Sequence, residues 1–248
     1  MTVHTSTLAH FHDDPPPSDV LTGLRSPGLL ARWPVIGITM FIFGSLVFGA
    51  LTYNLFAQGP LLVWDKALAN MLPAIALKSP AFVKFLMIAG FYIGKDVITG
   101  IDLLLALYLL YKKFWQEFAM VTIGWGGYVL LFNLFSRLIG RPRPPTQIWI
   151  IVNLPGFPSG HAICAVVCYG LLGYLLAAKM PSVFWKGIVV AASLLVIGFI
   201  GFSRMFTGGH YLTDILAGYA VGIAWFGAAY TLIEIWFKKR RMQNVKKE

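Results

Sequence analysis

Long apolar runs constrain this 248-residue chain more than any other feature of its sequence. Residues 34–56 carry no charge and residues 184–202 carry one, over the roughly 20 positions that a helix needs to cross a bilayer. These runs are continuous rather than alternating, which disfavours a membrane β-barrel. Charged residues make up only 12% of the chain, about half the share in soluble domains, so they cannot cover a water-facing surface of this size. The fold class is therefore predicted to be all-α, a helical bundle of a polytopic membrane protein.

Six transmembrane helices are predicted from the apolar runs. One run, residues 80–111, is too long for a single span and contains Lys95 and Asp96. It is interpreted as an interfacial segment that leads into a span beginning near residue 91. The predicted spans cover approximately residues 34–56, 91–111, 118–139, 161–178, 184–202 and 212–237.

The chain divides into three regions on this pattern. Residues 1–31 are polar and contain three consecutive prolines, so they are expected to form a disordered tail. Residues 32–237 form the six-span domain, and residues 238–248 form a basic tail.

The distribution of Lys and Arg predicts the orientation of the chain. A net charge of +10 suggests a nucleic-acid partner at first, but cytoplasmic loops of membrane proteins collect the same residues. We therefore expect no nucleic-acid partner and assign the charge to topology and to contacts with membrane lipids. Both tails and the loops after the second and fourth spans are basic, and six spans put them on one side. Both termini are accordingly expected in the cytoplasm, and the remaining loops at the exterior or in the periplasm.

Polar residues suited to chemistry gather in three stretches on the predicted outer side. The first, residues 141–145, reads Arg-Pro-Arg-Pro-Pro, and the second, residues 157–161, reads Phe-Pro-Ser-Gly-His. The third, residues 203–214, reads Ser-Arg-Met-Phe-Thr-Gly-Gly-His-Tyr-Leu-Thr-Asp. His161 and His210 are the two histidines outside the N-terminal tail, and both lie in these stretches.

The third stretch combines a candidate nucleophile with a group that can orient it. Asp214 follows His210 by one helical turn, so its carboxylate can accept a hydrogen bond from one imidazole nitrogen and leave the other free to attack. Gly208 and Gly209 allow the backbone to approach a ligand closely, and the planar guanidinium of Arg204 matches phosphate oxygens. The alternative is a His–Asp pair that only caps a helix.

The second stretch leads directly into a predicted helix, whose free N–H groups attract an anion. Ser159 can cap this helix or donate its hydroxyl to a phosphate, and His161 can act as a proton donor. The alternative is that Ser159 is only an N-cap and His161 an interfacial histidine.

The first stretch provides fixed positive charge. Arg141 and Arg143 stay protonated under ordinary conditions, and the neighbouring prolines stiffen the loop that carries them. A basic loop that binds lipid headgroups is the alternative. Together the three stretches offer cations for a dianionic oxyanion, a nucleophile and an acid, which favours phosphoryl transfer through a phosphohistidine.

In this order the three stretches resemble the signature of type 2 phosphatidic acid phosphatases, a superfamily that includes vanadium haloperoxidases. The signature reads Lys-x6-Arg-Pro, Pro-Ser-Gly-His and Ser-Arg-x5-His-x3-Asp. Residues 158–161 match its second part in full, and residues 203–214 match its third part. Arg143 and Pro144 match the end of the first part, but Ser136 stands where the family has lysine.

The resemblance implies a role for each matching residue. His210 is expected to form the phosphohistidine, Asp214 to orient it and His161 to protonate the leaving group. The residues expected to hold the phosphoryl oxygens are Arg143, Arg204, Ser159 and Gly160. The family chemistry needs no metal and no cofactor. Its candidate substrates are phosphatidic acid, phosphatidylglycerol phosphate, undecaprenyl diphosphate and lipid A phosphates, and the motifs do not choose among them.

The missing lysine leaves one phosphate contact to be replaced. Arg137 is the favoured substitute because it is the next residue, although a shift of one position turns a side chain by about 100° around a helix. Lys95, near the outer end of the second predicted span, is the alternative, unless it only pairs with Asp96.

These observations predict an integral membrane lipid phosphatase with its site on the outer face of the cell membrane. A lipid phosphotransferase would use the same histidine, so the motifs do not separate the two activities. A non-catalytic protein that binds or transports lipid phosphates is a third possibility, which Ser136 favours and the intact set of His161, His210 and Asp214 disfavours. The oligomeric state stays open.

Overall fold

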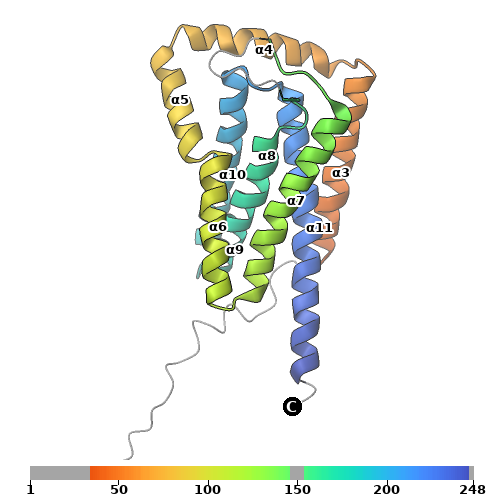
Figure 1. Ribbon diagram of the computed structural model, residues 1–248, viewed down its shortest axis with the longest axis vertical. Coiled ribbons are helices and arrows are strands. Elements are labelled where there is room, and N and C mark those ends of the chain that lie inside the picture. The colour runs from red at the N-terminus through yellow and green to blue at the C-terminus, as the bar shows by residue number, and fades with distance from the viewer. Residues whose placement is uncertain (1–33, 146–153, 246–248) are drawn as a thin grey trace, which may run out of the picture.

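The computed structural model describes residues 34–145 and 154–245. Within these ranges every regular element is a helix, and most helices run side by side along one axis as a bundle (Figure 1). The all-α, polytopic fold predicted from the apolar runs is therefore confirmed. The predicted tail over residues 1–31 lies outside the described residues.

The elements follow one another in chain order. They are α3 (Pro34–Phe56), α4 (Leu61–Leu77), α5 (Pro80–Tyr92), α6 (Lys95–Tyr111), α7 (Trp115–Ile139), α8 (Gly160–Cys164), the π-helical η1 (Ala165–Tyr169), α9 (Gly170–Lys179), α10 (Val183–Phe206) and α11 (Leu212–Val245). The segments α8, η1 and α9 join end to end into one helical stretch of 20 residues.

Five helical stretches of the described ranges are long and apolar enough to cross a membrane, namely Pro34–Phe56, Trp115–Ile139, Gly160–Lys179, Val183–Phe206 and Leu212–Gln243. The remaining predicted span corresponds to α6, whose 17 residues extend about 26 Å and fall short of a bilayer core of about 30 Å. Helix α6 is short because residues 93–94 form a turn that interrupts the helix between α5 and α6. The predicted count of six is therefore approximate.

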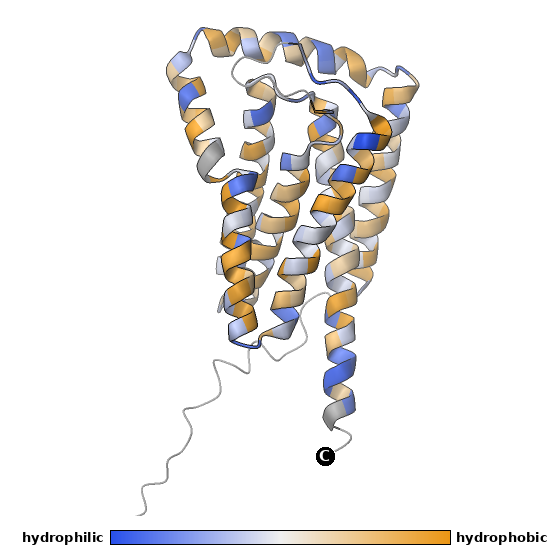
Figure 2. Cartoon of the chain, viewed as in Figure 1, coloured by the Kyte–Doolittle hydropathy of each residue, from blue (hydrophilic) through white to orange (hydrophobic). Residues whose placement is uncertain are grey.

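The outer surface of the bundle is apolar. Large apolar side chains are exposed along α3, α6 and α10, among them Phe43, Leu104 and Leu195. Hydrophilic residues gather towards the two ends of the bundle (Figure 2). A monomeric soluble protein rarely exposes so large an apolar surface, so this is the pattern of a surface in contact with lipid.

Helix α4 is not predicted from the apolar runs, because Asp65, Lys66 and Pro73 interrupt its sequence and its 17 residues are too few for a span. It crosses one end of the bundle at a steep angle to the other helices (Figure 1). Its buried face consists of Asp65, Ala69, Pro73 and Ala76, which are three or four residues apart and share one side of the helix. This side packs on the end of the bundle.

The end covered by α4 also gathers the three polar stretches. Helices α7 and α10 end there, while α8 and α11 begin there (Figure 1). At the end of α7, Gly140 has a φ of +64°, the left-handed conformation that terminates a helix and turns the chain into residues 141–145. Segments far apart in the sequence are thus brought to one place.

Helix α11 continues past the predicted end of its span, so residues 238–245 are helical. Its last turns are hydrophilic and extend beyond the bundle at the end opposite to α4 (Figure 2). There the Arg240 guanidinium carbon lies 4.3 Å from the ring centroid of Trp236, and Arg241 donates a 3.2 Å hydrogen bond to Gln116. These contacts stabilise the part of α11 that contains the basic residues 238–241.

Helices α3 and α11 pack closely through small residues. A Cβ added to Gly227 would lie 2.5 Å from the carbonyl oxygen of Gly37, and one added to Gly44 would lie 2.5 Å from the carbonyl oxygen of Ala220. The two backbones therefore approach each other with no room for a side chain between them, as in other close helix pairs of membrane proteins.

We expect Gly227→Ala to lower the melting temperature of the purified protein, because the added methyl group forces the two helices apart at a cost of about 1–3 kcal/mol. Gly49→Ala on α3 is the matched control, since a Cβ added there meets nothing within 4 Å. Thermal unfolding in detergent, followed by circular dichroism, compares the two variants. Equal melting temperatures for both variants would contradict the close packing.

Candidate active site

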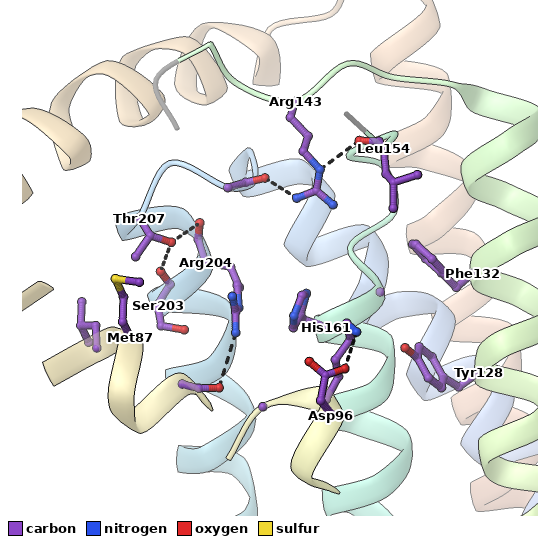
Figure 3. A pocket seen from close by; sticks show the side chains of 16 residues that line it. Met87, Asp96, Tyr128, Phe132, Arg143, Leu154, His161, Ser203, Arg204 and Thr207 are labelled. Carbon is purple, nitrogen blue, oxygen red and sulfur yellow. Dashed lines mark hydrogen bonds and ion pairs between the residues drawn. The ribbon is translucent and has the colours of Figure 1, made fainter. Parts of the chain in front are cut away.

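A cavity of about 570 Å³ lies where the three polar stretches meet (Figure 3). Its walls come from α5, α6, α7, α8 and α10 and from the loops that follow α7 and α10. The predicted site residues that line the cavity are Arg143, Gly160, His161 and Arg204. They are joined by Lys95, Asp96, Tyr128 and Phe132, among others. Residues from all three stretches thus converge on one cavity.

His210 is almost completely buried, and its two ring nitrogens have different partners. Nδ1 lies 2.9 Å from the carbonyl oxygen of Gly156, and since a carbonyl only accepts, Nδ1 carries the proton. Nε2 is then an acceptor, 3.0 Å from Nη1 of Arg143, which lines the cavity. In this tautomer the lone pair of Nε2 accepts a hydrogen bond from the Arg143 guanidinium, and a bound phosphoryl group would have to displace that donor before Nε2 could attack it.

Asp214 is fully buried beside His210. Its Oδ2 lies 3.5 Å from Nδ1 of His210 and accepts a 2.9 Å hydrogen bond from the backbone N–H of Tyr211. The shorter partner of Nδ1 is the Gly156 carbonyl, which is not predicted from the sequence because it is a backbone group 54 residues away. Asp214 therefore adds negative charge near the ring, while Gly156 accepts the hydrogen bond that fixes the tautomer.

Burial lowers the pKa of the His210 imidazole below its ordinary value of 6.5. The Asp214 carboxylate and the Gly156 carbonyl oppose this shift, and the Arg143 guanidinium adds to it. The neutral ring is therefore the main form of His210 at pH 7.

His161 lies near His210, in the first turn of α8. The centroids of the two imidazole rings are 6.3 Å apart, and the rings are inclined at 69°. Both rings are therefore close enough to contact one substrate group. His161 lines the cavity directly (Figure 3), whereas His210 is buried beside Arg143 and is not among the lining residues.

Two arginines face the cavity from different elements. Arg143 donates from Nε to the carbonyl oxygen of Leu154 at 3.0 Å and from Nη1 to that of Gly209 at 2.8 Å (Figure 3). Arg204 donates from Nη2 to the carbonyl oxygen of Gly90 at 3.4 Å. These carbonyl contacts hold both guanidinium groups without neutralising their charge, so the charge stays available to an anion.

Two buried donors of the site have no hydrogen-bond partner within the described part of the chain. They are the hydroxyl of Ser159 and Nε of Arg204. A buried polar group without a partner costs about 1–3 kcal/mol, and native proteins leave few of them. The two groups are therefore candidate hydrogen-bond donors to a ligand.

Tertiary contacts fix the loop that carries Ser159. Phe157 is fully buried in a cluster between α3 and α11, and the backbone N–H of Ser159 donates to the carbonyl oxygen of Asp214 at 2.9 Å. A Cβ added to Gly160 would lie 2.9 Å from the ring of Phe132, so only glycine fits there without a shift. The loop is thereby held against the start of α11.

The two candidates for the missing lysine contact lie in different places. Ser136 is buried in α7, whereas Arg137 is exposed and does not line the cavity. The shift of one residue accounts for this, because it turns the side chain by about 100° from the face that Ser136 occupies. Lys95, in the first turn of α6, lines the cavity instead, and its Nζ lies 2.6 Å from Oδ1 of Asp96. The additional cation at the cavity is therefore Lys95 of α6, and not the favoured candidate Arg137 of α7.

Arg141 does not line the cavity, although its stretch was predicted to bind an anion. Its guanidinium is buried and lies 2.7 Å from Oδ2 of Asp65 and 2.6 Å from Oδ1 of Asp214. Asp65 belongs to α4 and was not predicted, because its partner follows it by 76 residues and no motif joins them.

The cavity is suited to an anion. No group of three or more His, Cys, Asp or Glu side chains in residues 34–145 and 154–245 is arranged to hold a metal ion. The charged side chains that face the cavity are Arg143, Arg204, Lys95 and Asp96. Positive charge exceeds negative charge there, which raises the local concentration of anionic ligands.

The fold and the cavity together define the class of protein. It is a helical multi-pass membrane protein that has two neighbouring histidines and a cationic pocket at one end of its bundle. Residues 119–238, which contain all three polar stretches, match the model of the PAP2 superfamily. These residues therefore have the sequence of a PAP2 superfamily domain, and the resemblance of the motifs is confirmed.

Two curated relatives and a solved structure are similar to this chain. Phosphatidylglycerophosphatase B of Bacillus subtilis is 24% identical over 197 residues, which cover 76% of this chain and 90% of that protein. A lipid A 1-phosphatase of Rhizobium johnstonii is 28% identical over 186 residues, which cover 65% of this chain and 72% of that protein. The crystal structure of a transmembrane PAP2 type phosphatidylglycerolphosphate phosphatase from Bacillus subtilis aligns with a TM-score of 0.65 at 21% identity. This alignment covers 82% of this chain and 96% of the other, and it shows a shared fold.

Proposed function

We propose that this protein is an integral membrane lipid phosphatase that removes a phosphate group through a phosphohistidine at His210. The observation that carries the proposal is the arrangement of the His210 ring, with Nδ1–H donated to Gly156 and Nε2 beside Arg143. The relatives are named as a phosphatidylglycerophosphatase and a lipid A phosphatase, so lipids that carry a phosphate group are the substrate class.

The phosphoryl group binds among the cations of the cavity. Arg143 and Arg204 contact its oxygens, because a planar guanidinium matches two phosphate oxygens at once. The Ser159 hydroxyl and Nε of Arg204, which have no partner in the described chain, donate to the remaining oxygens. Gly160 lines the same cavity and lets the backbone approach the ligand.

In the first step Nε2 of His210 attacks phosphorus, and the bond between phosphorus and the lipid oxygen breaks. His161 donates a proton to that oxygen, so the lipid leaves as a neutral alcohol, or as a phosphate if the substrate is a diphosphate. The negative charge of Asp214 stabilises the positive charge that the ring acquires.

In the second step a water molecule attacks the phosphohistidine. His161 accepts the proton from this water, the nitrogen–phosphorus bond breaks, and His210 returns to its neutral state with release of inorganic phosphate. No metal ion takes part in either step of this proposal.

The cavity faces the exterior or the periplasm in this proposal. Its support is the basic run of residues 238–241 in α11, which lies at the opposite end of the bundle and belongs in the cytoplasm by the positive-inside rule (Figure 2). The cavity then lies near the lipid headgroups. An amphiphilic substrate can present its phosphate there while its acyl chains stay in the bilayer.

Phosphate release from a panel of lipid phosphates tests the proposal. The purified protein, in detergent with excess chelator, is given phosphatidylglycerol phosphate, phosphatidic acid, lipid A phosphate and undecaprenyl diphosphate. We expect chelator-resistant release, with the preferred lipid identifying the substrate. Loss of phosphate from the substrate that needs a lipid acceptor, with the phosphate recovered on that acceptor instead of in solution, would indicate a phosphotransferase. Lipid binding without any turnover would indicate a non-catalytic protein and overturn the proposal.

The pH dependence of the reaction follows from His210. Because its pKa is lowered, the ring stays neutral to a more acidic pH than an ordinary histidine. We expect kcat/KM to fall on the acid side with a midpoint below pH 6.5, since protonation of Nε2 removes the attacking lone pair. Rates measured from about pH 4.5 to about pH 8 check this, and an acid midpoint above 6.5 would contradict the assignment of His210.

We expect Lys95→Ala to weaken substrate binding more than Arg137→Ala. Lys95 lines the cavity, whereas Arg137 is exposed outside it, so Arg137→Ala is the matched control for the loss of one positive charge. The expected effect is a rise in KM of about 10-fold for Lys95→Ala, as for one charge-assisted hydrogen bond of about 1.5 kcal/mol, and less than about 2-fold for the control. A larger effect of Arg137→Ala than of Lys95→Ala would support Arg137 as the replacement for the family lysine.

A further inference from the structure

A buried group of three charged residues and a threonine, which we call the anchor network, lies next to the candidate site. It consists of Asp65 of α4, Arg141 from the loop after α7, and Thr213 and Asp214 of α11. Their side chains are at most 9% exposed, and none of them lines the cavity. The proposed phosphatase chemistry uses only Asp214, so the other members have no role yet.

Arg141 is the centre of the anchor network. Its Nη1 donates to Asp214 Oδ1 at 2.6 Å and to Thr213 Oγ1 at 2.7 Å, and its Nη2 donates to Asp65 Oδ2 at 2.7 Å. The ring of Tyr211 covers the guanidinium, with 4.2 Å between its carbon and the ring centroid. Arg141 is therefore fixed in one orientation and has carboxylates on both sides.

Arg141 also supports the second partner of His210. Its backbone carbonyl accepts a 2.7 Å hydrogen bond from the N–H of Gly156, whose own carbonyl accepts from Nδ1 of His210. Both groups on the Nδ1 side of His210, the Asp214 carboxylate and the Gly156 carbonyl, are thus held by one residue.

Asp65 attaches α4 to the start of α11. Its Oδ1 accepts a 2.9 Å hydrogen bond from the backbone N–H of Thr213, one of the free N–H groups of the first turn. Its Oδ2 accepts from the Thr213 hydroxyl at 2.5 Å and from Arg141 at 2.7 Å. Asp65 thus caps the N-terminus of α11 from another helix, because its carboxylate accepts a hydrogen bond from a free N–H of the first turn, as an N-cap side chain does.

Charge distinguishes Asp65 from a purely structural anchor. Asp65 and Asp214 both form ion pairs with the Arg141 guanidinium, at 2.7 Å and 2.6 Å. Two carboxylates and one guanidinium give the network a net charge of −1. Without Asp65, Arg141 would neutralise Asp214, and His210 would face a neutral pair. In a buried site such a difference acts strongly, because the effective dielectric constant is low.

We propose that Asp65 is a positioning residue for His210, which holds Asp214 and Gly156 in place through Arg141 and gives the anchor network the net negative charge that stabilises the phosphohistidine. This inference rests on the proposed function. Asp65 itself touches neither the substrate nor the imidazole, and acts only through Arg141 and Asp214.

Other groups face His210 and stay constant in a test of Asp65. They are Asp214 from α11, the Gly156 carbonyl, Arg143 from the loop after α7, and the His161 ring from α8. A change at Asp65 removes none of these groups, so it reaches the ring only through Arg141 and the net charge of the network. The His210 imidazole is therefore a local probe of the charge of the network.

A charge cycle at two positions tests the proposal. Asp65→Asn gives the network a net charge of 0, Arg141→Gln a charge of −2, and the double variant the native charge of −1. We expect the pKa of His210 to be lowest in Asp65→Asn, highest in Arg141→Gln, and near the native value in the double variant. Nitrogen NMR of histidine-labelled protein in detergent reports this pKa without need for activity, with His210→Gln to assign the signal.

The same cycle predicts the kinetics. We expect Asp65→Asn to lower kcat by about 10- to 100-fold with little change in KM, as for outer partners of other active-site side chains. The double variant should recover much of the loss, whereas structural damage at two buried sites would add. Glu234→Gln is the matched control, a buried carboxylate about 30 Å away along α11 that accepts from Tyr174.

The outcomes separate this inference from the proposed function. If the pKa of His210 is the same in the native protein and in all three variants, the role of Asp65 is overturned, whether or not the native protein is a phosphatase. The expected pKa order in a protein without phosphatase activity supports the role of the charge and overturns the proposed function alone. If Asp65→Asn does not fold, the double variant is compared with Arg141→Gln, and an equal pKa of His210 in both overturns the inference.

Discussion

His210→Ala is expected to lower the rate of phosphate release by about 10⁴-fold or more, because the variant lacks the atom that forms the proposed covalent intermediate. The cationic cavity remains, since Arg143, Arg204 and Ser159 do not depend on the imidazole for their main contacts. KM is therefore expected to change much less than kcat. Measurement of both constants on the preferred lipid, after adjustment for folded protein, gives the comparison.

Two controls accompany this result. The melting temperature of His210→Ala shows whether the protein folds, because His210 is buried and its loss leaves a hole behind Arg143. His210→Gln fills more of this space and has no nucleophilic nitrogen, so it is expected to be as inactive as His210→Ala. A folded variant that retains more than about a tenth of the native rate would rule out the histidine mechanism.

His161→Gln is expected to lower kcat on lipid phosphates by about 10²- to 10⁴-fold, the usual contribution of a general acid. The loss depends on the leaving group. A lipid alkoxide needs a proton as it leaves, whereas the nitrophenolate of nitrophenyl phosphate does not. We therefore expect a much smaller effect on the first step with the nitrophenyl substrate. Because the variant also lacks the base for the second step, phosphohistidine should accumulate.

Rapid-quench kinetics on the two substrates check the role of His161. A burst of nitrophenolate followed by slow turnover is the expected pattern for His161→Gln. An equal loss on both substrates, with no burst, would show that His161 does not act as the acid. It lines the cavity 6.3 Å from the His210 ring, so a role in phosphate binding would then be the remaining explanation.

Prediction of the fold succeeded where a signal is local in the sequence. Helices α3 and α10 could be predicted because each is a nearly uninterrupted apolar run of 23 or 24 residues. Helix α4 could not, since its apolar residues are interrupted and its position depends on a buried carboxylate, Asp65. The break between α5 and α6 was reflected only in the charged pair Lys95 and Asp96, which did not fix its position.

The residues of the candidate site likewise divide into those that a local motif predicts and those that only tertiary packing brings in. Its motif residues lie within short segments, and His161, Arg143 and Arg204 all reach one cavity. Lys95, Asp65 and the Gly156 carbonyl enter through tertiary packing between distant segments, for which a single sequence has no pattern. The sequence could not tell which of Arg137 and Lys95 reaches the cavity, because this depends on which face of α7 packs towards the cavity.

Trapping of the covalent intermediate tests the proposed mechanism most directly. The native protein is mixed with a lipid carrying a labelled phosphate, quenched within milliseconds to seconds, and digested for mass spectrometry. We expect label on His210 that is stable in base, lost in acid and absent in His210→Ala. Phosphate release without label on His210 in any quenched sample would contradict the mechanism.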